Sequence, residues 1–259
     1  MTPHQEACVA FGRQLIDTSD LDPLYTVLDY ARLDPVLLGR YLLAYGMFYH
    51  WGVAAGIAQA PDFWDMARQA DEEKWPRGTE RRHFRGAISR NSIAFCSAFG
   101  EPEETLARIY PGTGALTFHQ VFDGAQTLSG FGPWIAFKMA DIADRTGYRA
   151  VDFAGCNLSI YRDPVKGAAL WRYDDQNAPI RPGEVGPVCE EIRLALGPER
   201  LAPPRFERPI NIQEVETVLC KYKSHVNGHY PPGKDTREGF HALAGWGPLA
   251  DRIAECPLF

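Results

Sequence analysis

The sequence predicts an all-α protein. Most of its segments place apolar residues at the spacing of one helix face, several begin with a capping residue or a proline, and strand-like alternation is scarce. Its 259 residues, 45% hydrophobic and 23% charged, have the balance of an ordinary globular protein. We therefore expect one helical domain with two lobes, spanning residues 1–259.

The first strongly helical segment follows Asp34-Pro35, where the aspartate provides an N-cap and the proline fits the first helical position. Residues from Val36 to Ile57 are apolar on nearly every side, and the glycines among them allow close approach of neighbouring helices. We therefore expect one buried central helix over this range. Another helix begins after Pro61-Asp62.

Further helices are expected along the chain. One begins at Thr79, with phenylalanines on one face and arginines on another, and others cover residues 102–109, 116–128 and 183–196. Residues 155–182 are rich in glycine, proline and aspartate, so we expect them to be irregular.

The last strong helix signal is a capping box. Asn211 stands three residues before Glu214, ahead of an apolar stripe that includes Val215 and Leu219. This arrangement predicts a helix that begins at residue 212.

Several protein classes are excluded. No apolar run reaches the roughly 18 residues that span a bilayer, and the N-terminus lacks the basic and apolar regions of a signal peptide. No two of the six cysteines form a C-x-x-C pair, so we expect reduced, mostly buried thiols and no iron–sulfur site. These features predict a cytoplasmic protein without membrane contact.

The net charge of −6 argues against nucleic acid, but phosphate is bound by local charge density. Residues 74–90 contain six lysines and arginines against the single acid Glu80. Residues 221–237 contain four against Asp235. An acidic protein with two such basic segments can bind DNA at one face.

The most informative segment reads L-S-G-F-G-P-W-I-A from Leu128 to Ala136. Gly130 and Gly132 flank Phe131 between two predicted helices, within about residues 116–146. A tight glycine turn there exposes successive backbone N–H groups at a helix N-terminus, which can hold one DNA phosphate. The alternative is a plain connection whose glycines serve packing.

The pattern L-x-G-x-G-x-x-x-A resembles the hairpin of the helix-hairpin-helix DNA glycosylases, such as the endonuclease III family. The resemblance implies a helix-hairpin-helix glycosylase-like fold, with two helical lobes and a cleft between them. It also implies a catalytic aspartate at the start of a later helix, 24 residues after the hairpin leucine, which is Asp152 here. The alternative role of Asp152 is a plain N-cap.

Two departures limit this resemblance. Trp134 stands where the bifunctional glycosylases carry a lysine nucleophile, so Schiff-base chemistry is not expected. The cysteine cluster that many of those enzymes place after the aspartate is also missing.

The first basic segment contains Arg81, Arg82 and Arg85. On a helix, Arg81 and Arg85 share a face, and guanidinium groups bind phosphate oxygens in pairs. The segment therefore predicts a site for pyrophosphate or the DNA backbone. The alternative is a solvated helix face on which Glu80 pairs with an arginine.

The second basic segment, residues 220–235, places Lys221 near a helix end and Lys234 in a following glycine–proline loop. The spacing of its cysteine and two histidines fits no common zinc site, so we expect no metal.

Across nearly the whole chain, the sequence resembles the phage enzymes that hypermodify thymine. These are the amino acid:DNA transferases, or α-glutamyl/putrescinyl thymine pyrophosphorylases, and the two basic segments and the diverged hairpin carry the match. The resemblance implies a double-stranded DNA substrate in which 5-hydroxymethyluracil is pyrophosphorylated on its methyl oxygen. It implies that an amine from an amino acid or a polyamine replaces the pyrophosphate.

The residues suggest how this reaction would proceed. We expect the base to be flipped out of the stack, and Asp152 to deprotonate the amine. The expected ligands of the leaving pyrophosphate are Arg81, Arg82, Arg85, Lys221 and Lys234. An amine donor with a carboxylate would need one more arginine, Arg77 or Arg162.

No cofactor is expected to be required, and a monovalent cation at the hairpin is kept as an alternative. Two competing functions also stay open. A base-excision glycosylase would use the aspartate and the hairpin, but would leave the basic segments unexplained. A non-catalytic DNA-binding module would use the hairpin alone.

Overall fold

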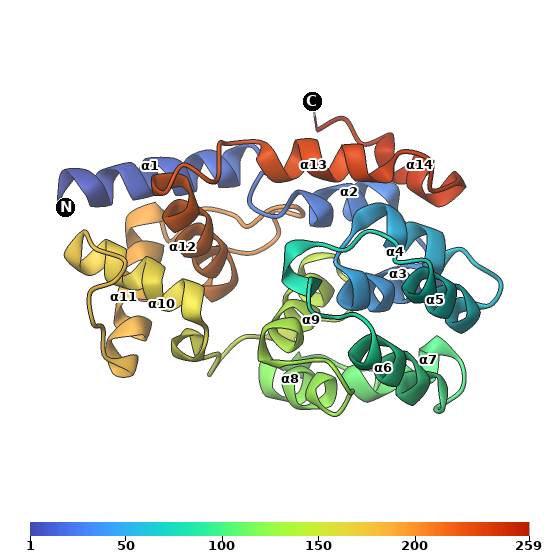
Figure 1. Cartoon of the computed structure of the whole chain (residues 1–259). Coiled ribbons are helices and arrows are strands. Elements are labelled where there is room, and N and C mark those ends of the chain that lie inside the picture. The colour runs from blue at the N-terminus through green and yellow to red at the C-terminus, as the bar shows by residue number, and fades with distance from the viewer. Residues whose placement is uncertain (259) are drawn as a thin grey trace. The chain divides into compact units, whose positions relative to one another are not determined.

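The computed structural model describes residues 1–258 and is mostly helical (Figure 1). The strands in these residues are β1 (Leu116–Thr117) and β2 (Val151–Asp152), so the all-α prediction is confirmed. The chain forms two compact units. Unit 1 contains Met1–Thr26 and Gly155–Thr236, and unit 2 contains Val27–Ala154 and the residues from Arg237 onward.

Unit 1 is a cluster of helices in which α12 packs against α1, α10 and α11. Its elements are α1 (Pro3–Asp17), η2 (Leu158–Ile160), α10 (Arg162–Tyr173), α11 (Pro182–Leu196) and α12 (Ile212–Val226). Val215, Val218 and Leu219 of α12 are buried, and the side chains of Asn211 and Glu214 form the expected capping box. The predicted helix at this position is therefore confirmed.

Unit 2 contains most of the remaining helices. They are α3 (Pro35–Phe48), α4 (Trp51–Ala58), α5 (Phe63–Glu72), η1 (Thr79–Arg81), α6 (Ala87–Ser97), α7 (Pro102–Ile109), α8 (Phe118–Gln126), α9 (Pro133–Arg145) and α14 (Pro248–Ala254). Two further helices, α2 (Pro23–Ala31) and α13 (Lys234–Leu243), begin in unit 1 and continue into unit 2.

The single central helix predicted from Val36 to Ile57 is wrong, because α3 and α4 are separate helices. Tyr49 adopts a left-handed conformation with a φ of 52°, and the His50 side chain then caps α4 by accepting a hydrogen bond from the Val53 N–H. The break lets α3 and α4 pack against each other, so burial on both helices compensates for the interrupted hydrogen-bond ladder.

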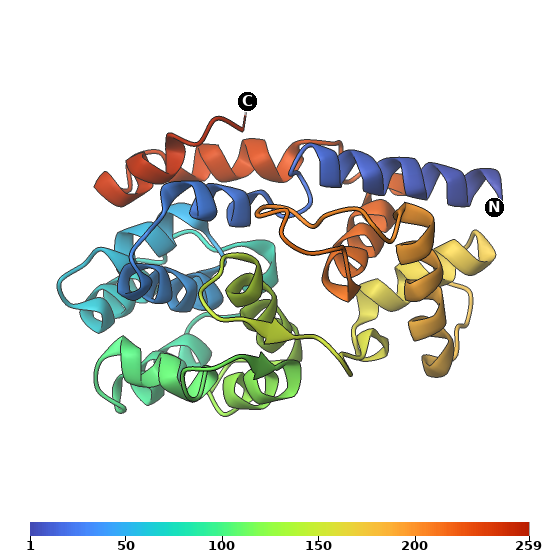
Figure 2. The ribbon, with the colours of Figure 1, turned by 180° about the vertical axis from the view of Figure 1, so that it is seen from behind.

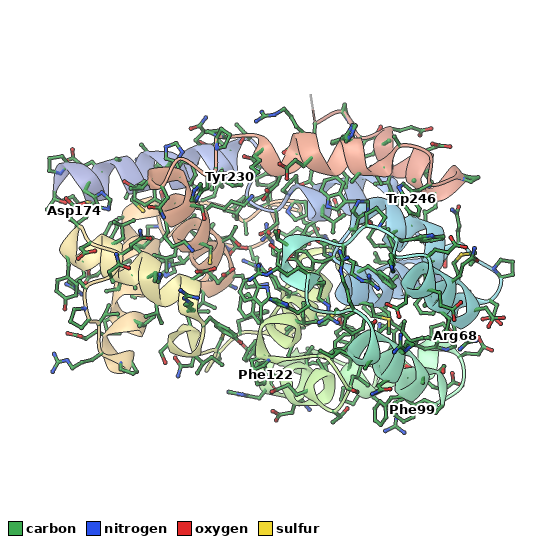
Figure 3. The ribbon with its side chains drawn as sticks, in the orientation of Figure 1. Arg68, Phe99, Phe122, Asp174, Tyr230 and Trp246 are labelled. Atoms are coloured by element: carbon green, nitrogen blue, oxygen red, sulfur yellow. The ribbon has the colours of Figure 1, made fainter. Side chains whose placement is uncertain are left out.

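The expected close approach at the glycines is confirmed at Gly52. A Cβ atom at this position would lie 2.1 Å from the Ala242 carbonyl oxygen and from the Trp246 ring. Trp246 (Figure 3) also contacts Trp75, with ring centroids 5.0 Å apart. The C-terminal residues of unit 2 therefore pack directly on α4.

The helix predicted from Thr79 is also wrong in its start. Only the short 3-10 helix η1 forms there, and the α-helix begins at Ala87 after Gly86, whose φ is 64°. Arg81 and Phe84 are buried, so the packing of these side chains determines the backbone here, and no continuous helix forms. Arg81 and Arg85 consequently do not share a helix face.

Several elements differ from the prediction. Residues 155–182 contain α10, whose Pro164 falls in the first turn, where the missing N–H costs no helix hydrogen bond. The strands β1 and β2 pair in parallel, with Leu116 opposite Val151 and Thr117 opposite Asp152 (Figure 2).

The expectations about membrane spans and cysteines agree with the structure. Within residues 1–258, no helix is both long and apolar enough to cross a membrane. All six cysteines are free thiols and four of them are buried, as predicted.

Candidate functional site

The predicted hairpin is present as a local structure. The helices α8 and α9 pack against each other and are joined by residues 127–132. Gly130 has a φ of 80°, which favours glycine, and Gly132 is the N-cap of α9, with Pro133 at the first helical position. Gly132 has no side chain to cap α9, so the positive N-terminal end of this helix can accept an anion.

Side chains from the first basic segment support the hairpin. Arg81 donates from Nη1 to the Gly130 carbonyl oxygen at 2.8 Å and from Nε to the Met47 carbonyl oxygen at 2.9 Å. The Ser92 hydroxyl donates to the Ser129 carbonyl oxygen at 2.5 Å. The structure therefore brings together two motifs that are some fifty residues apart in sequence.

Arg81 is a buried cation. Its guanidinium lies 3.9 Å from the centroid of the Phe84 ring and 5.4 Å from that of Phe131. Burial, followed by the charge of Arg77, lowers the pKa of Arg81 to about 9. The residue therefore keeps its positive charge at neutral pH, next to the Gly130 carbonyl of the hairpin.

Arg77 is also buried and has a carboxylate partner. Its Nη2 atom lies 2.5 Å from Oδ1 of Asp71, and its side chain is 1% exposed. Its charge is therefore neutralised inside unit 2, which leaves it unsuited to hold the carboxylate of an amine donor. The other suggested arginine, Arg162, is exposed at the start of α10 in unit 1.

The exposed cations of this segment flank the hairpin contact. Arg82 and Arg85 are both exposed. Phe84, which lies between them in sequence, packs against the hairpin, because a Cβ atom on Gly130 would lie 2.9 Å from the Phe84 ring. Arg82 donates to His83 and to the Thr79 carbonyl oxygen. Arg85 makes no side-chain hydrogen bond within residues 1–258. Both guanidinium groups therefore belong to exposed residues of the first basic segment.

Asp152 lies in β2 and is exposed, not at the start of a helix as expected. The pairing of β2 with β1 fixes its backbone, and Oδ1 of Asp144 accepts a hydrogen bond from the Val151 N–H at 3.0 Å. One carboxylate oxygen of Asp152 accepts from the Ala154 N–H at 2.9 Å. Asp152 therefore caps a turn after a strand through one oxygen, and its side chain is exposed.

The strand that carries Asp152 is attached to the hairpin helices. Phe153 packs against Phe118 of α8 and Phe137 of α9, with ring centroids 5.3 and 6.0 Å apart. The hairpin, Arg82, Arg85 and Asp152 thus belong to one packed unit.

A buried charge pair in α9 is not among the residues predicted from the sequence. Lys138 lies over the rings of Trp134 and Phe137, at 5.1 and 5.3 Å from their centroids, and its Nζ atom is 3.2 Å from Oδ2 of the fully buried Asp141. A lysine and an aspartate three residues apart inside an otherwise apolar helix were the available signal. Trp134, in the position of the glycosylase lysine, contributes an aromatic face to this cluster.

The second basic segment lies in unit 1, where Lys221 is buried. Its Nζ atom contacts the Asp20 carbonyl oxygen at 2.7 Å, the Tyr230 hydroxyl at 2.6 Å and Oδ2 of Asp235 at 2.7 Å. Burial, with the charges of Asp235 and Asp20, raises the pKa of Tyr230 (Figure 3). Lys234 is more accessible and donates to the His229 carbonyl oxygen at 3.2 Å.

This network fixes the glycine–proline loop. Asp20 accepts from the Gly233 N–H at 2.6 Å and from the Thr236 hydroxyl at 2.8 Å. Lys221 therefore has a structural position, while Lys234 stands at the more exposed end of the same loop. Of the five predicted cations, three belong to unit 2 and these two to unit 1.

Comparison with known proteins identifies the family. The sequence model of the family described as "Amino acid:DNA transferase" matches residues 37–230. The chain belongs to the amino acid:DNA transferase family. The matched range of this transferase includes the hairpin, Asp152, the first basic segment and Lys221, while Lys234 lies just beyond it.

Two phage proteins are similar over most of the transferase chain. A glycinyltransferase of Pseudomonas phage PaMx11 is 36% identical over 266 residues, covering 93% of this chain and 91% of the relative. A putrescinyltransferase of Delftia phage PhiW-14 is 28% identical over 248 residues, covering 91% of this chain and 78% of the relative. The predicted family is confirmed, and the glycosylase-like framework with its cleft stays a prediction.

Proposed function

We propose that this protein transfers an amine onto the 5-methylene of pyrophosphorylated 5-hydroxymethyluracil in double-stranded DNA. The observation that carries the proposal is the family match over residues 37–230, together with two relatives named for the amines glycine and putrescine. These names favour a transferase over a base-excision glycosylase or a DNA-binding module.

The proposed reaction is a displacement at an exocyclic carbon. The amine nitrogen contributes its lone pair to a new C–N bond, while the C–O bond breaks and pyrophosphate leaves with that electron pair. One proton is released from the attacking nitrogen. Conjugation with the pyrimidine ring makes the methylene electron-poor, and extrusion of the base gives the amine access to it.

The roles of the cations follow from their exposure. Arg82, Arg85 and Lys234 are the proposed ligands of pyrophosphate or of the DNA backbone, because their charged groups are accessible. Arg81 and Lys221 are proposed as positioning residues, because protein groups surround both cations. Gly130, Phe131 and Gly132 form the proposed phosphate contact of the hairpin.

Asp152 is proposed as the general base that accepts the proton of the attacking amine. Its exposure and its rigid attachment to β2 support this role. No cofactor is proposed. At the hairpin, hydrogen bonds from Ser92 and Arg81 already reach the carbonyl oxygens of residues 129 and 130, which leaves little need for a monovalent cation.

The function is tested with duplex DNA that bears 5-pyrophosphomethyluracil. The protein is incubated with this DNA and with glycine or putrescine, and the digested nucleosides are analysed by mass spectrometry. A nucleoside heavier than thymidine by one donor, with release of pyrophosphate, is expected. Free modified base and abasic sites would instead identify a glycosylase, and DNA binding without any product would identify a binding module.

Asp152→Asn tests the proposed base in the same assay. We expect turnover to fall by about 100-fold or more, since a positioned general base contributes roughly 10²–10⁴ in rate. Asp123→Asn, at an exposed aspartate of α8, serves as the matched control and should leave turnover unchanged. Normal turnover in Asp152→Asn would contradict the role.

A further inference from the structure

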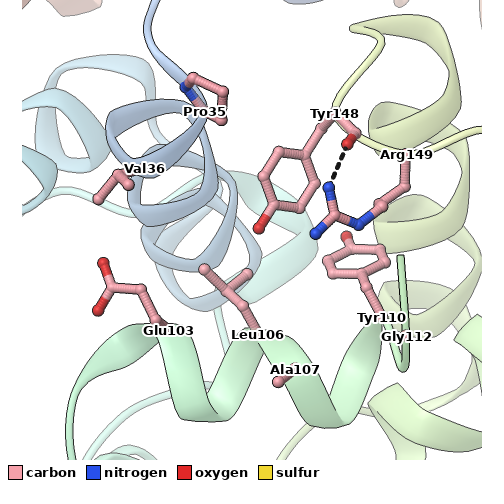
Figure 4. A pocket seen from close by; sticks show the side chains of 9 residues that line it. All are labelled: Pro35, Val36, Glu103, Leu106, Ala107, Tyr110, Gly112, Tyr148 and Arg149. Atoms are coloured by element: carbon pink, nitrogen blue, oxygen red, sulfur yellow. Dashed lines mark hydrogen bonds between the residues drawn. The ribbon is translucent and has the colours of Figure 1, made fainter. Parts of the chain in front are cut away.

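A pocket in unit 2 has no role in the reaction as proposed so far (Figure 4). Its volume is about 280 Å³. Glu103, Leu106 and Ala107 of α7 form one wall, and Tyr148 and Arg149 line the opposite side. Ligand pockets usually have roughly 300–1,000 Å³, so this one suits a very small molecule.

Arg149 supplies an unneutralised positive charge to the pocket. No carboxylate lies within ion-pair distance of its guanidinium among residues 1–258, and its buried Nε atom has no hydrogen-bond partner. Nη1 donates to the Tyr148 carbonyl oxygen at 3.0 Å, and the guanidinium lies 4.8 Å from the centroid of the Tyr148 ring. Buried polar groups are nearly always paired, and an arginine fork is matched by a carboxylate.

Glu103 supplies a carboxylate that is shared with Arg40. Its Oε1 atom accepts from Nε of Arg40 at 2.9 Å, while Oε2 has no partner among the described residues. Tyr148 lies between the two charged side chains (Figure 4). The pKa of Tyr148 is raised by burial, with Arg149 lowering it and Glu103 raising it, so the hydroxyl is within electrostatic reach of both.

We propose that this pocket binds the amine donor as a small α-amino acid, with its carboxylate on Arg149 and its ammonium group at Glu103. This inference rests on the proposed function and deepens it by giving the donor its own site. Leu106 and Ala107 leave room for a hydrogen or a small side chain. A diamine such as putrescine has no carboxylate to pair with Arg149.

The pocket is close to the proposed base along the chain. Arg149 precedes Asp152 by three residues, so their Cα atoms cannot be more than about 11 Å apart. The segment that leads into β2 therefore carries both the donor site and the group that accepts the donor's proton.

Direct binding tests the pocket without any reaction. Isothermal titration calorimetry of the full chain is carried out with glycine, ethanolamine and putrescine, in the absence of DNA. We expect glycine to bind at least about tenfold more tightly than the two amines without a carboxylate, since only glycine can form a hydrogen-bonded charge pair with Arg149. Equal binding of glycine and putrescine, or no binding of glycine, would overturn the proposal.

Two variants change the pocket in independent ways. Arg149→Met removes the charge and should weaken glycine binding by about tenfold or more. Ala107→Leu, at an exposed helix position on the pocket wall, fills the space without changing any charge and should also weaken it. Arg108→Met removes an exposed arginine of the same helix that does not line the pocket, and should bind glycine normally. Because Ala107→Leu leaves Arg149 in place, it tests the site even if Arg149→Met fails to fold.

Turnover separates the two proposals. In both pocket variants, KM for glycine should rise by about tenfold or more. In Arg149→Met, transfer of amines without a carboxylate should keep its rate, because they do not use the lost charge. If the wild-type protein transfers amines but both variants keep the wild-type KM and affinity for glycine, the pocket is not the donor site and the proposed function stands. If glycine binds and Arg149→Met abolishes this binding, but no amine is ever transferred, the pocket stands and the proposed function is wrong.

Discussion

Single charged side chains in this protein differ sharply in what surrounds them. Arg81 is enclosed by two carbonyl oxygens and two aromatic rings, whereas Arg82, its neighbour in sequence, is exposed. Burying a cation is costly unless polar groups compensate. Here two backbone oxygens accept from Nε and Nη1, while the buried Nη2 atom has no hydrogen-bond partner among residues 1–258. The burial of Arg81 therefore links the hairpin to the first basic segment, and Arg82 is left for external contacts.

Substitution of these two arginines should have very different effects on stability. Arg81→Met should lower the free energy of unfolding by roughly 3 kcal/mol, because it removes the hydrogen bonds to the buried carbonyl of Met47 and to the carbonyl of Gly130. Arg82→Met should change it by less than about 0.5 kcal/mol, as expected of an exposed side chain. Urea unfolding of both variants checks this, and equal stabilities would mean that Arg81 does not support the hairpin.

The exposed arginines should appear in the salt dependence of DNA binding. Each phosphate contact contributes about 0.9 to the slope of log K against log salt concentration for duplex DNA. Arg82→Ala and Arg85→Ala should therefore each reduce this slope by about one. Arg68→Ala is the control, since Arg68 (Figure 3) is an exposed arginine of α5 that pairs with Asp65. A slope unchanged in the first two variants would place the DNA elsewhere.

At the scale of elements, the hairpin depends on two glycines for different reasons. Gly130 has a positive φ, and a side chain there would meet the Phe84 ring. Gly132 has a φ of −76°, and a Cβ atom would meet nothing within 4 Å. The first glycine is required by the fold of the turn, and the second leaves the N-terminus of α9 open.

Alanine substitutions can distinguish the roles of the two glycines. Gly130→Ala should destabilise the protein by about 1–2 kcal/mol, since alanine is strained at this φ and crowds Phe84. Gly132→Ala should leave the unfolding temperature within a degree or two of wild type, while weakening DNA binding if the phosphate approaches this N-terminus. Thermal unfolding and DNA titration of both variants distinguish these effects. Loss of stability in Gly132→Ala would mean that the turn is more tightly packed than the structure indicates.

Local signals predicted some elements well. The capping box at Asn211 and Glu214 and the glycine turn at residues 130–132 depend on neighbours in sequence, so they could be predicted from the sequence. The break at Tyr49 depends on the packing of α3 against α4, and the late start of α6 depends on the burial of Arg81. These are tertiary effects that override helix propensity.

The candidate site was predictable to a similar extent. The hairpin and the exposed cations Arg82 and Arg85 are visible in the sequence. The position of Asp152 in a strand is not, because β2 exists only through its pairing with residues 116–117. Arg149 is an ordinary surface residue by sequence, and only the fold places it opposite Glu103.

At the scale of the whole molecule, the family match spans parts of both units, and each unit has a buried polar network of its own. In unit 2 it centres on Arg81, and in unit 1 on Lys221 with Asp20 and Tyr230. Both units also bury ionisable thiols and phenols in their neutral forms. Cys8 and Cys189 belong to unit 1, and Cys96 and Tyr110 belong to unit 2.

These neutral groups should make the protein sensitive to alkali. Burial raises the pKa of Cys8, Cys96 and Cys189 from 9.0 to about 12, and raises the pKa of Tyr41 and Tyr110 well above 10.0. Above pH 9 the unfolded chain therefore releases protons that the folded chain retains. Their contribution to stability is complete below pH 9 and is lost as the pH rises toward 12.

Arg81 works in the opposite direction, because its lowered pKa of about 9 lets the folded chain lose a proton before the unfolded chain does. Burial lowers the pKa of Arg77 as well, but such groups are outnumbered by the thiols and phenols, so the net slope of stability against pH should be negative. Urea unfolding in steps of about one pH unit from about pH 7.5 to about pH 10.5 should show a falling free energy of unfolding. Arg81→Met should fall more steeply over the same steps, since it lacks the opposing group. A wild-type stability that stays constant through this range would mean that the buried thiols and phenols ionise in the folded protein.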